Sequence, residues 1–130
     1  MSHSQKIKTN FVDLTCLKAA LASFGWNDVQ ERTTAKTYSG DSARTRIYDY
    51  VAVNPHRGGY DLGFMQEGNK IEAYGDFFGG SLEQSFGNNL KELKKAYSNS
   101  VFTTEWEAQG FTVFATEDER GGILLEAELA

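Results

Sequence analysis

Residues 109–127, QGFTVFATEDERGGILLEA, decide the fold class of this chain. Gly110 is typical of the position just after a helix. Two apolar segments follow, 111–116 and 122–129, and the polar, Gly-rich stretch between them is typical of a turn. We therefore expect a helix end followed by a hairpin, in which a C-terminal strand pair closes an antiparallel sheet. No reactive side chain is set into this hairpin.

In the rest of the chain, apolar residues recur either at every second position, as in strands, or at helical spacing. Period two predicts strands at 5–12, 29–38, 46–53, 60–65 and 70–76, with turns between the last three. Asp13 is a candidate N-cap for a helix that ends near Gly25. Ser81 and Gln84 form a capping-box pattern at the start of a second helix. We expect that helix to be interrupted at 98–100 and a further helical piece at 101–109.

This order of elements predicts an α+β fold. Consecutive strands joined by short turns pair antiparallel, because parallel strands need a long crossover. We expect a mostly antiparallel sheet with the helices packed on one face. A ferredoxin-like arrangement with extra strands satisfies this order, and the order of strands in the sheet stays open. The length of 130 residues fits a single α+β domain, 1–130.

Composition and charge narrow the range of functions. The formal net charge is -5, with 18 acidic and 13 basic residues. Proteins that bind nucleic acid usually cluster their basic residues, so we rank this class of partner last. Lys91, Lys94 and Lys95 are the best basic patch, and with Glu92 among them they are interpreted as a solvated helix face.

The sequence gives little support for a catalytic cysteine, a metal site or a membrane-spanning segment. Cys16 is the single cysteine, and its apolar neighbours predict a buried thiol on a helix rather than a nucleophile. His3 and His56 do not suffice for a zinc site, so we expect no metal and no cofactor. Residues 1–6 lack an apolar segment, and no run is long enough to span a bilayer. We expect a soluble protein of a reducing compartment.

The stretch 76–81, Asp76-Phe77-Phe78-Gly79-Gly80-Ser81, is the main candidate site. It runs from a strand into a helix start, where backbone amides can hold an anion. In the alternative interpretation, Gly79 and Gly80 permit a sharp turn while one of the two Phe side chains fills the core. If the site is functional, we expect Asp76, Phe78 and the helix start to contact a ligand or a partner.

Asp61 and Asp76 form a second candidate set, because both lie near the ends of neighbouring predicted strands. A carboxylate pair can perform general acid–base chemistry when its environment separates the two pKa values. His56 and Arg57 lie in the Gly-rich loop at 54–59 and could join them in a pocket. Ordinary surface carboxylates are the competing interpretation.

Residues spread over most of the chain carry a family resemblance: 1–3, 7–9, 13–14, Leu17, Ala20, Leu21, 60–64, 76–79, Tyr97, 109–111, Val113 and 122–123. On these residues the chain resembles the family of the hypothetical chloroplast reading frame thirty-five, with relatives in cyanobacteria, other bacteria and phages. Two departures stand out: the family tends to have an aromatic residue where this chain has Ser4, and Trp where this chain has Phe77 and Phe78. The resemblance implies a protein of the cytoplasm or of the plastid stroma. It also implies an accessory role, since some bacterial relatives are encoded near an ATPase of the AAA type.

These observations lead to a non-enzymatic accessory protein that acts through a protein partner. The alternative is a domain that binds a small molecule or an anion at Gly79, Gly80 and Ser81. Because the C-terminal strand could form an uncovered sheet edge, a homodimer is also expected to be feasible.

Overall fold

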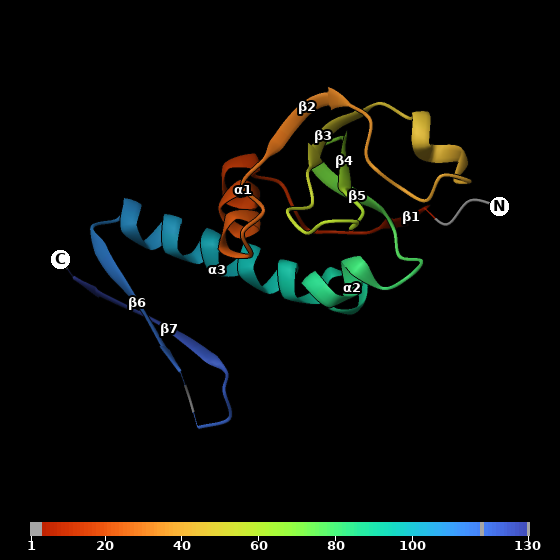
Figure 1. The fold of residues 1–130 in the computed structure, drawn as a ribbon. Coiled ribbons are helices and arrows are strands. Elements are labelled where there is room, and N and C mark those ends of the chain that lie inside the picture. Colours follow the sequence, from red (N-terminus) through yellow and green to blue (C-terminus); the bar gives the residue numbers. More distant parts are fainter. Residues whose placement is uncertain (1–3, 118, 130) are drawn as a thin grey trace.

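The computed structural model describes residues 4–117 and 119–129 (Figure 1). Its main element is a five-stranded sheet in the order β1-β5-β4-β3-β2, in which every neighbouring pair is antiparallel. The α+β class is confirmed. The strands are β1 (Ser4–Ile7), β2 (Val29–Thr33), β3 (Tyr48–Ala52), β4 (Leu62–Glu67) and β5 (Lys70–Asp76).

The first helix connects the two edges of this sheet. α1 (Leu14–Ser23) runs from β1 at one edge to β2 at the other, so β2 to β5 form a meander. This order, rather than a ferredoxin-like one, satisfies the α+β pattern. The predicted cap is present, because the Asp13 side chain accepts a hydrogen bond from the Cys16 amide. Gly25 follows the helix with a positive φ of 83°, a conformation that glycine adopts without strain.

The second helical region differs from the prediction in where it breaks. α2 (Ser81–Phe86) is followed by the 3-10 turn η2 (Asn88–Leu90) and then by α3 (Lys91–Ala108). The break predicted at 98–100 is wrong, because α3 runs through these residues without interruption. Leu93, Tyr97 and Val101 continue one apolar stripe toward the core, and this packing outweighs the weak helix preference of Ser and Asn.

One hydrophobic core lies between the sheet and the helices. It joins Phe64 and Ile71 of the sheet to Leu17 and Leu21 of α1, and it continues to Leu93 of α3. The predicted packing of helices on one sheet face is therefore confirmed, and Cys16 is buried as expected. On the opposite face Ala35, Tyr48 and Val51 form a smaller cluster.

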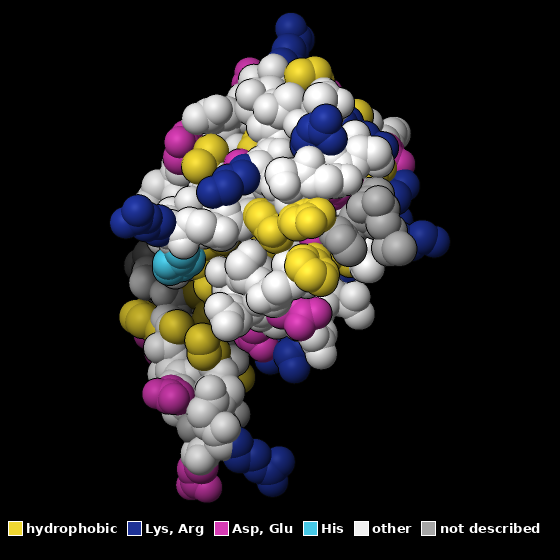
Figure 2. Space-filling view, turned by 45° about the vertical axis from the view of Figure 1, so that its right-hand side comes forward, with side chains coloured by type: hydrophobic (Ala, Val, Ile, Leu, Met, Phe, Trp, Pro, Cys, Tyr) yellow, Lys and Arg dark blue, Asp and Glu magenta, His cyan; other side chains and the backbone are white. Residues whose placement is uncertain are grey.

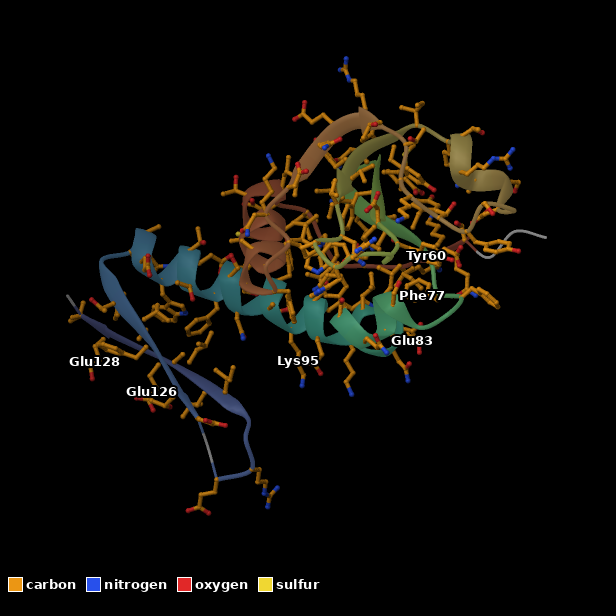
Figure 3. All side chains as sticks on the ribbon, viewed as in Figure 1. Tyr60, Phe77, Glu83, Lys95, Glu126 and Glu128 are labelled. Carbon is orange, nitrogen blue, oxygen red and sulfur yellow. The ribbon has the colours of Figure 1, made fainter. Side chains whose placement is uncertain are left out.

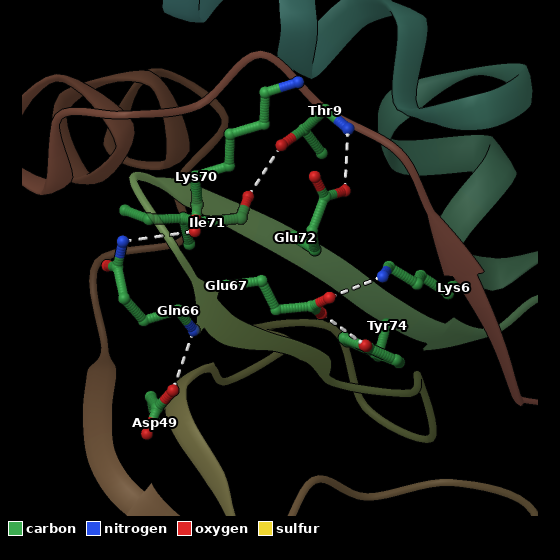
Figure 4. Close-up of polar contacts among 9 residues, drawn as sticks. All are labelled: Lys6, Thr9, Asp49, Gln66, Glu67, Lys70, Ile71, Glu72 and Tyr74. Carbon is green, nitrogen blue, oxygen red and sulfur yellow. Dashed lines mark hydrogen bonds and ion pairs between the residues drawn. The ribbon is translucent and has the colours of Figure 1, made fainter.

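β1 is shorter than the strand predicted at 5–12, because side-chain hydrogen bonds interrupt the backbone ladder after Ile7. The Thr9 amide donates to the buried Glu72 carboxylate at 3.0 Å, and the Thr9 hydroxyl donates to the Ile71 carbonyl at 2.6 Å (Figure 4). The chain then turns across the sheet edge with the ring of Phe11 fully buried. The alternation of apolar and polar residues in the sequence therefore continues past the end of the strand.

β2 is also shorter than the strand predicted at 29–38. It ends at Thr33, and Arg32 has a positive φ of 51°. The chain leaves the sheet as the segment 34–47, which contains the 3-10 turn η1 (Ser42–Thr45). Side chains of the sheet hold this segment in place, as described below.

The C-terminal hairpin is present, but its predicted place in the fold is wrong. β6 (Phe111–Glu117) and β7 (Ile123–Leu129) form a separate two-stranded sheet and do not close the main one. Figures 1 and 2 show the hairpin projecting from the body of the molecule. α3 has 18 residues, so it carries the chain about 27 Å away from its own start before β6 begins.

Candidate functional site

Asp61 is an internal anchor in this structure. It precedes β4, and its two carboxylate oxygens accept hydrogen bonds from the amides of Asn54 at 2.9 Å and Lys36 at 2.8 Å. The Asp61 amide donates in return to the Lys36 carbonyl at 2.9 Å. The carboxylate therefore ties the loop at 54–59 and the segment 34–47 to the sheet.

Asp76 has the same kind of role on the neighbouring strand. Leu62 pairs with Gly75, which places Asp61 and Asp76 at the same end of β4 and β5. Asp76 is 0% exposed, and its oxygens accept from the amides of Tyr38 and Phe78, both at 2.9 Å. Because backbone amides occupy both carboxylates, the geometry favours a structural role for the pair.

A third buried carboxylate was missed by the sequence analysis. Asp41 lies in the stretch interpreted as a turn or mobile loop, yet it is fully buried. Its side chain accepts from the Ala43 amide at 2.9 Å and from the Ser4 hydroxyl. The sequence holds one signal for this, since Asp followed by Ser-Ala is typical of an N-cap, and Asp41 caps η1.

The stretch 77–81 separates into a buried part and an exposed part. Phe77 packs against the core, while Phe78 is 55% exposed and its ring lies 5.8 Å from that of the 41% exposed Tyr38. Gly79 and Gly80 have positive φ values of 82° and 78°, which permits the turn into α2. Figure 2 shows hydrophobic side chains gathered near the middle of one face of the molecule.

The predicted capping box at Ser81 is wrong. Gly80 is the N-cap of α2 and supplies no side chain, and Ser81 is already the first residue of the helix. The Ser81 hydroxyl instead accepts a hydrogen bond from the Tyr60 amide at 3.3 Å. This bond places the start of α2 against the loop that precedes β4; Figure 3 shows Tyr60, Phe77 and Glu83 around this junction.

A cleft of about 530 Å³ brings together three of the predicted site residues, His56, Arg57 and Ser81. Phe24 and Trp26, which follow α1, also line it. Asp61 and Asp76 are not among its lining residues, so the four charged or titratable residues considered above do not converge in one pocket. The full lining is Phe24, Trp26, Asn54, His56, Arg57, Gly58, Gly59, Ser81, Gln84 and Ser85.

The loop that carries His56 and Arg57 is braced by Asn54. The Asn54 side chain accepts from the His56 amide at 2.8 Å and donates to the Tyr60 carbonyl at 3.0 Å. A Cβ at Gly59 would lie 2.2 Å from Nδ2 of the Asn54 side chain. Glycine at this position therefore lets the backbone lie against the Asn54 side chain. The cleft wall is therefore preorganised although His56 and Arg57 themselves are exposed.

The hairpin is a further candidate that the site prediction missed. In its register Val113 pairs with Ala127, and Ala115 pairs with Leu125. Successive side chains alternate between faces, so one face carries almost only apolar side chains. Of the described residues of β6 and β7, none is buried. The members of this apolar face are Phe111, Val113, Ala115, Ile123, Leu125, Ala127 and Leu129.

α3 contacts this face at its base, and farther out Ile123 lines a cleft together with Lys91, Lys94 and Lys95 of α3. The Trp106 ring makes an edge contact with Phe111, with centroids 4.9 Å apart, and Phe102 lies beside Trp106 at 5.8 Å. At the ends of β7, Ile123 is 65% exposed and Leu129 is 79% exposed. The opposite face carries Glu126 and Glu128, which Figure 3 shows on the hairpin away from the body.

The amino-acid sequence matches the model of the family described as "Protein of unknown function (DUF1257)" over residues 20–125. The chain belongs to this family. The match begins within α1 and ends within β7, and so includes the cleft and most of the hairpin. No curated protein and no solved structure matches the chain.

Among 4–117 and 119–129, no helix is both long and apolar enough to cross a bilayer. Within the same residues, no group of three or more His, Cys, Asp and Glu is arranged to hold a metal ion.

Proposed function

We propose that this chain is a non-enzymatic accessory protein that binds a protein partner, and that the hairpin β6–β7 is its docking element. The observation that carries the proposal is the apolar face of the hairpin, on which no residue is buried and Ala115, Ile123 and Leu129 are exposed. A two-stranded hairpin is marginally stable in water unless its apolar face packs against something. A partner that covers this face would stabilise the hairpin and bury the apolar side chains.

The charge of the hairpin indicates the chemistry of that partner. Glu117, Glu126 and Glu128 make the hairpin acidic. Glu117 pairs with Ile123 across the hairpin and so lies beside it on the apolar face, whereas Glu126 and Glu128 lie on the opposite face. A complementary surface would present apolar side chains flanked by Lys or Arg, because opposite charges steer association and fix the orientation of the complex. We therefore commit to a different protein with an apolar and basic docking surface.

The state of the buried carboxylates supports binding rather than catalysis. Asp61 and Asp76 are held by backbone amides, and Asp41 by an amide and a hydroxyl. A general base needs an accessible oxygen within hydrogen-bond reach of a substrate. The side chains that resembled an acid–base set thus already have structural partners.

The test compares two matched lysine substitutions on β7. Ile123→Lys places a charge on the apolar face, whereas Leu124→Lys places the same charge on the opposite face, where Leu124 is 53% exposed. Proteins captured from lysate are quantified for the wild type and both variants, and the affinity of each captured protein is then measured with purified components. We expect Ile123→Lys to lose the partner and Leu124→Lys to retain it.

Two outcomes would contradict the proposal. One is a purified partner that binds wild type and Ile123→Lys with equal affinity. The other is a dimer of this chain that Ile123→Lys dissociates, as measured by sedimentation, because the face would then be covered by a second copy. Phe78→Ala serves as a third variant. If only this variant loses the partner, the docking surface lies at the exposed Phe78 and Tyr38 and not on the hairpin.

We also propose that the protein is a member of the plastid and cyanobacterial family named above, with bacterial and phage relatives, and that it acts in the cytoplasm or the stroma. The motifs at 60–64, 76–79 and 109–111 support this placement. Fractionation of cells that express a tagged chain tests it, and recovery in the membrane pellet after a salt wash would contradict it.

A further inference from the structure

The cleft between the loop 54–59 and α2 holds a set of hydrogen-bond donors that the structure does not use. Within the described part of the chain, the Arg57 guanidinium makes no ion pair, and neither it nor the His56 ring has a hydrogen-bond partner. The side chains of Gln84 and Ser85, on α2, make no hydrogen bond with the described residues either. Ser81 only accepts, from the Tyr60 amide, so its own hydroxyl proton is available.

A buried donor in the wall of the same cleft also lacks a partner. Trp26 is 1% exposed, and its indole nitrogen has no hydrogen-bond partner among the described residues. A buried donor without an acceptor costs free energy, so such groups call for a specific explanation. Because Trp26 lines the cleft, the signal of its indole N–H can report on a ligand that occupies the cleft.

The charge around these donors selects an anion. Among the residues that the structure describes, no Asp or Glu lines the cleft, although the chain as a whole has more acidic than basic residues. Arg57 contributes a planar fork of donors that fits anionic oxygens. A carboxylate offers only two oxygens. His56 and Arg57 line the cleft on the loop 54–59, and Ser81 and Gln84 line it on α2, and this number of donors suits the three terminal oxygens of a phosphate group.

We propose that this cleft binds a phosphate-bearing small molecule, with Arg57 as the main charged contact and His56, Ser81 and Gln84 as further donors. The volume of about 530 Å³ has room for more than the phosphate group, and the aromatic side chains of Phe24 and Trp26 offer an apolar wall for the remainder. The site does not depend on α2 as a helix dipole, since α2 has only 6 residues. It is also independent of the hairpin.

Nuclear magnetic resonance of the full chain tests the proposal, with adenosine monophosphate and inorganic phosphate as probes and neutral adenosine as the control. The indole N–H signal of Trp26 is identified with the variant Trp106→Phe, because these are the two tryptophans of the chain. We expect adenosine monophosphate to shift this signal and the amide signals of 56–58, with saturation near about 1 mM or below. Adenosine should leave them unchanged.

Matched variants assign the binding to the cleft. Arg57→Gln should weaken binding at least about tenfold, the effect of losing a charge-assisted hydrogen bond. Arg32→Gln removes another exposed arginine, on β2, which lines no cleft described above, and should leave binding unchanged. His56→Gln is a second variant in the cleft, and a smaller loss of affinity is expected.

The proposal is overturned if neither phosphate probe binds, if adenosine binds as tightly as its monophosphate, or if Arg57→Gln binds like the wild type. Ile123→Lys separates this proposal from the preceding one, because it should abolish partner binding and leave phosphate binding intact.

Discussion

Gly63→Ala should destabilise the sheet through a single contact. A Cβ at Gly63 would lie 2.8 Å from two atoms and 2.9 Å from a third atom of the Tyr48 ring. Real Cβ atoms do not approach other heavy atoms this closely, so the ring or the backbone of β4 must move. Tyr48 is 1% exposed, and its ring packs beside that of Tyr74 at 5.8 Å, which restricts the movement.

The size of the effect follows from the cost of overpacking. Forcing a methyl group into a filled site costs about 1–3 kcal/mol, and we expect about 2 kcal/mol here because the ring is held on several sides. For a chain of 130 residues, this lowers the Tm by about 7 °C. Urea unfolding followed by circular dichroism measures the free energy, and the slope m should stay unchanged.

A double-mutant cycle identifies the contact. In the background of Tyr48→Ala the ring is absent, so Gly63→Ala should cost little or become slightly stabilising. Gly68→Ala is not a suitable control, since Gly68 has a positive φ of 65° and would be strained for another reason. If Gly63→Ala costs as much without the ring as with it, the reasoning from this contact is refuted.

Two further predictions concern ionisable side chains. Asp76→Ala should lower the free energy of unfolding by about 2–4 kcal/mol, because it removes two part-buried hydrogen bonds to a charged acceptor that is itself fully buried. Hydrogen exchange at the Tyr38 and Phe78 amides should accelerate, and unchanged exchange would contradict the anchoring role. The ion pair of Lys6 and Glu67, with 2.5 Å between Nζ and Oε1, gives a pH dependence. The Lys6 hydrogen bond, followed by that from Tyr74, holds the pKa of Glu67 below its usual value. A depressed folded-state pKa stabilises the fold above the unfolded-state pKa, and this stabilisation is lost as the pH falls through the folded-state pKa. In Lys6→Met the pKa of Glu67, followed by carboxyl chemical shifts, should rise, and the stability difference from wild type should shrink in acid; the effect is small because the pair is exposed, and it should weaken further in high salt.

How much the sequence alone determined depends on the range of the interactions involved. α1 was predicted with both of its ends, because Asp13 caps it and Gly25 follows it within the same short stretch. The hairpin was predicted for a similar reason, since its register depends on its own alternation and turn. The sequence also determined the α+β class, because the period of apolar residues separates strands from helices wherever one face of each is buried.

Tertiary structure determined where a strand ends in places where the backbone amides donate hydrogen bonds to side chains far away in the sequence. The segment 34–47 leaves the sheet because Asp61 and Asp76 bind its amides, and no local pattern in 34–47 announces these acceptors. The strand at the N-terminus ends early for the same reason, through Glu72 and the Thr9 amide.

The candidate sites show the same division. The sequence indicated His56, Arg57 and Ser81 as separate candidates from their residue types and neighbours. Only the packing of α2 against the loop 54–59 brings them into one cleft, and it leaves the two aspartates outside that cleft. The exposed apolar face of the hairpin was likewise invisible in the sequence, because alternation predicts which side chains share a face and not what covers that face. Covering depends on where α3 carries the chain, and that is set by long-range packing of the helix against the core rather than by the residues of the hairpin.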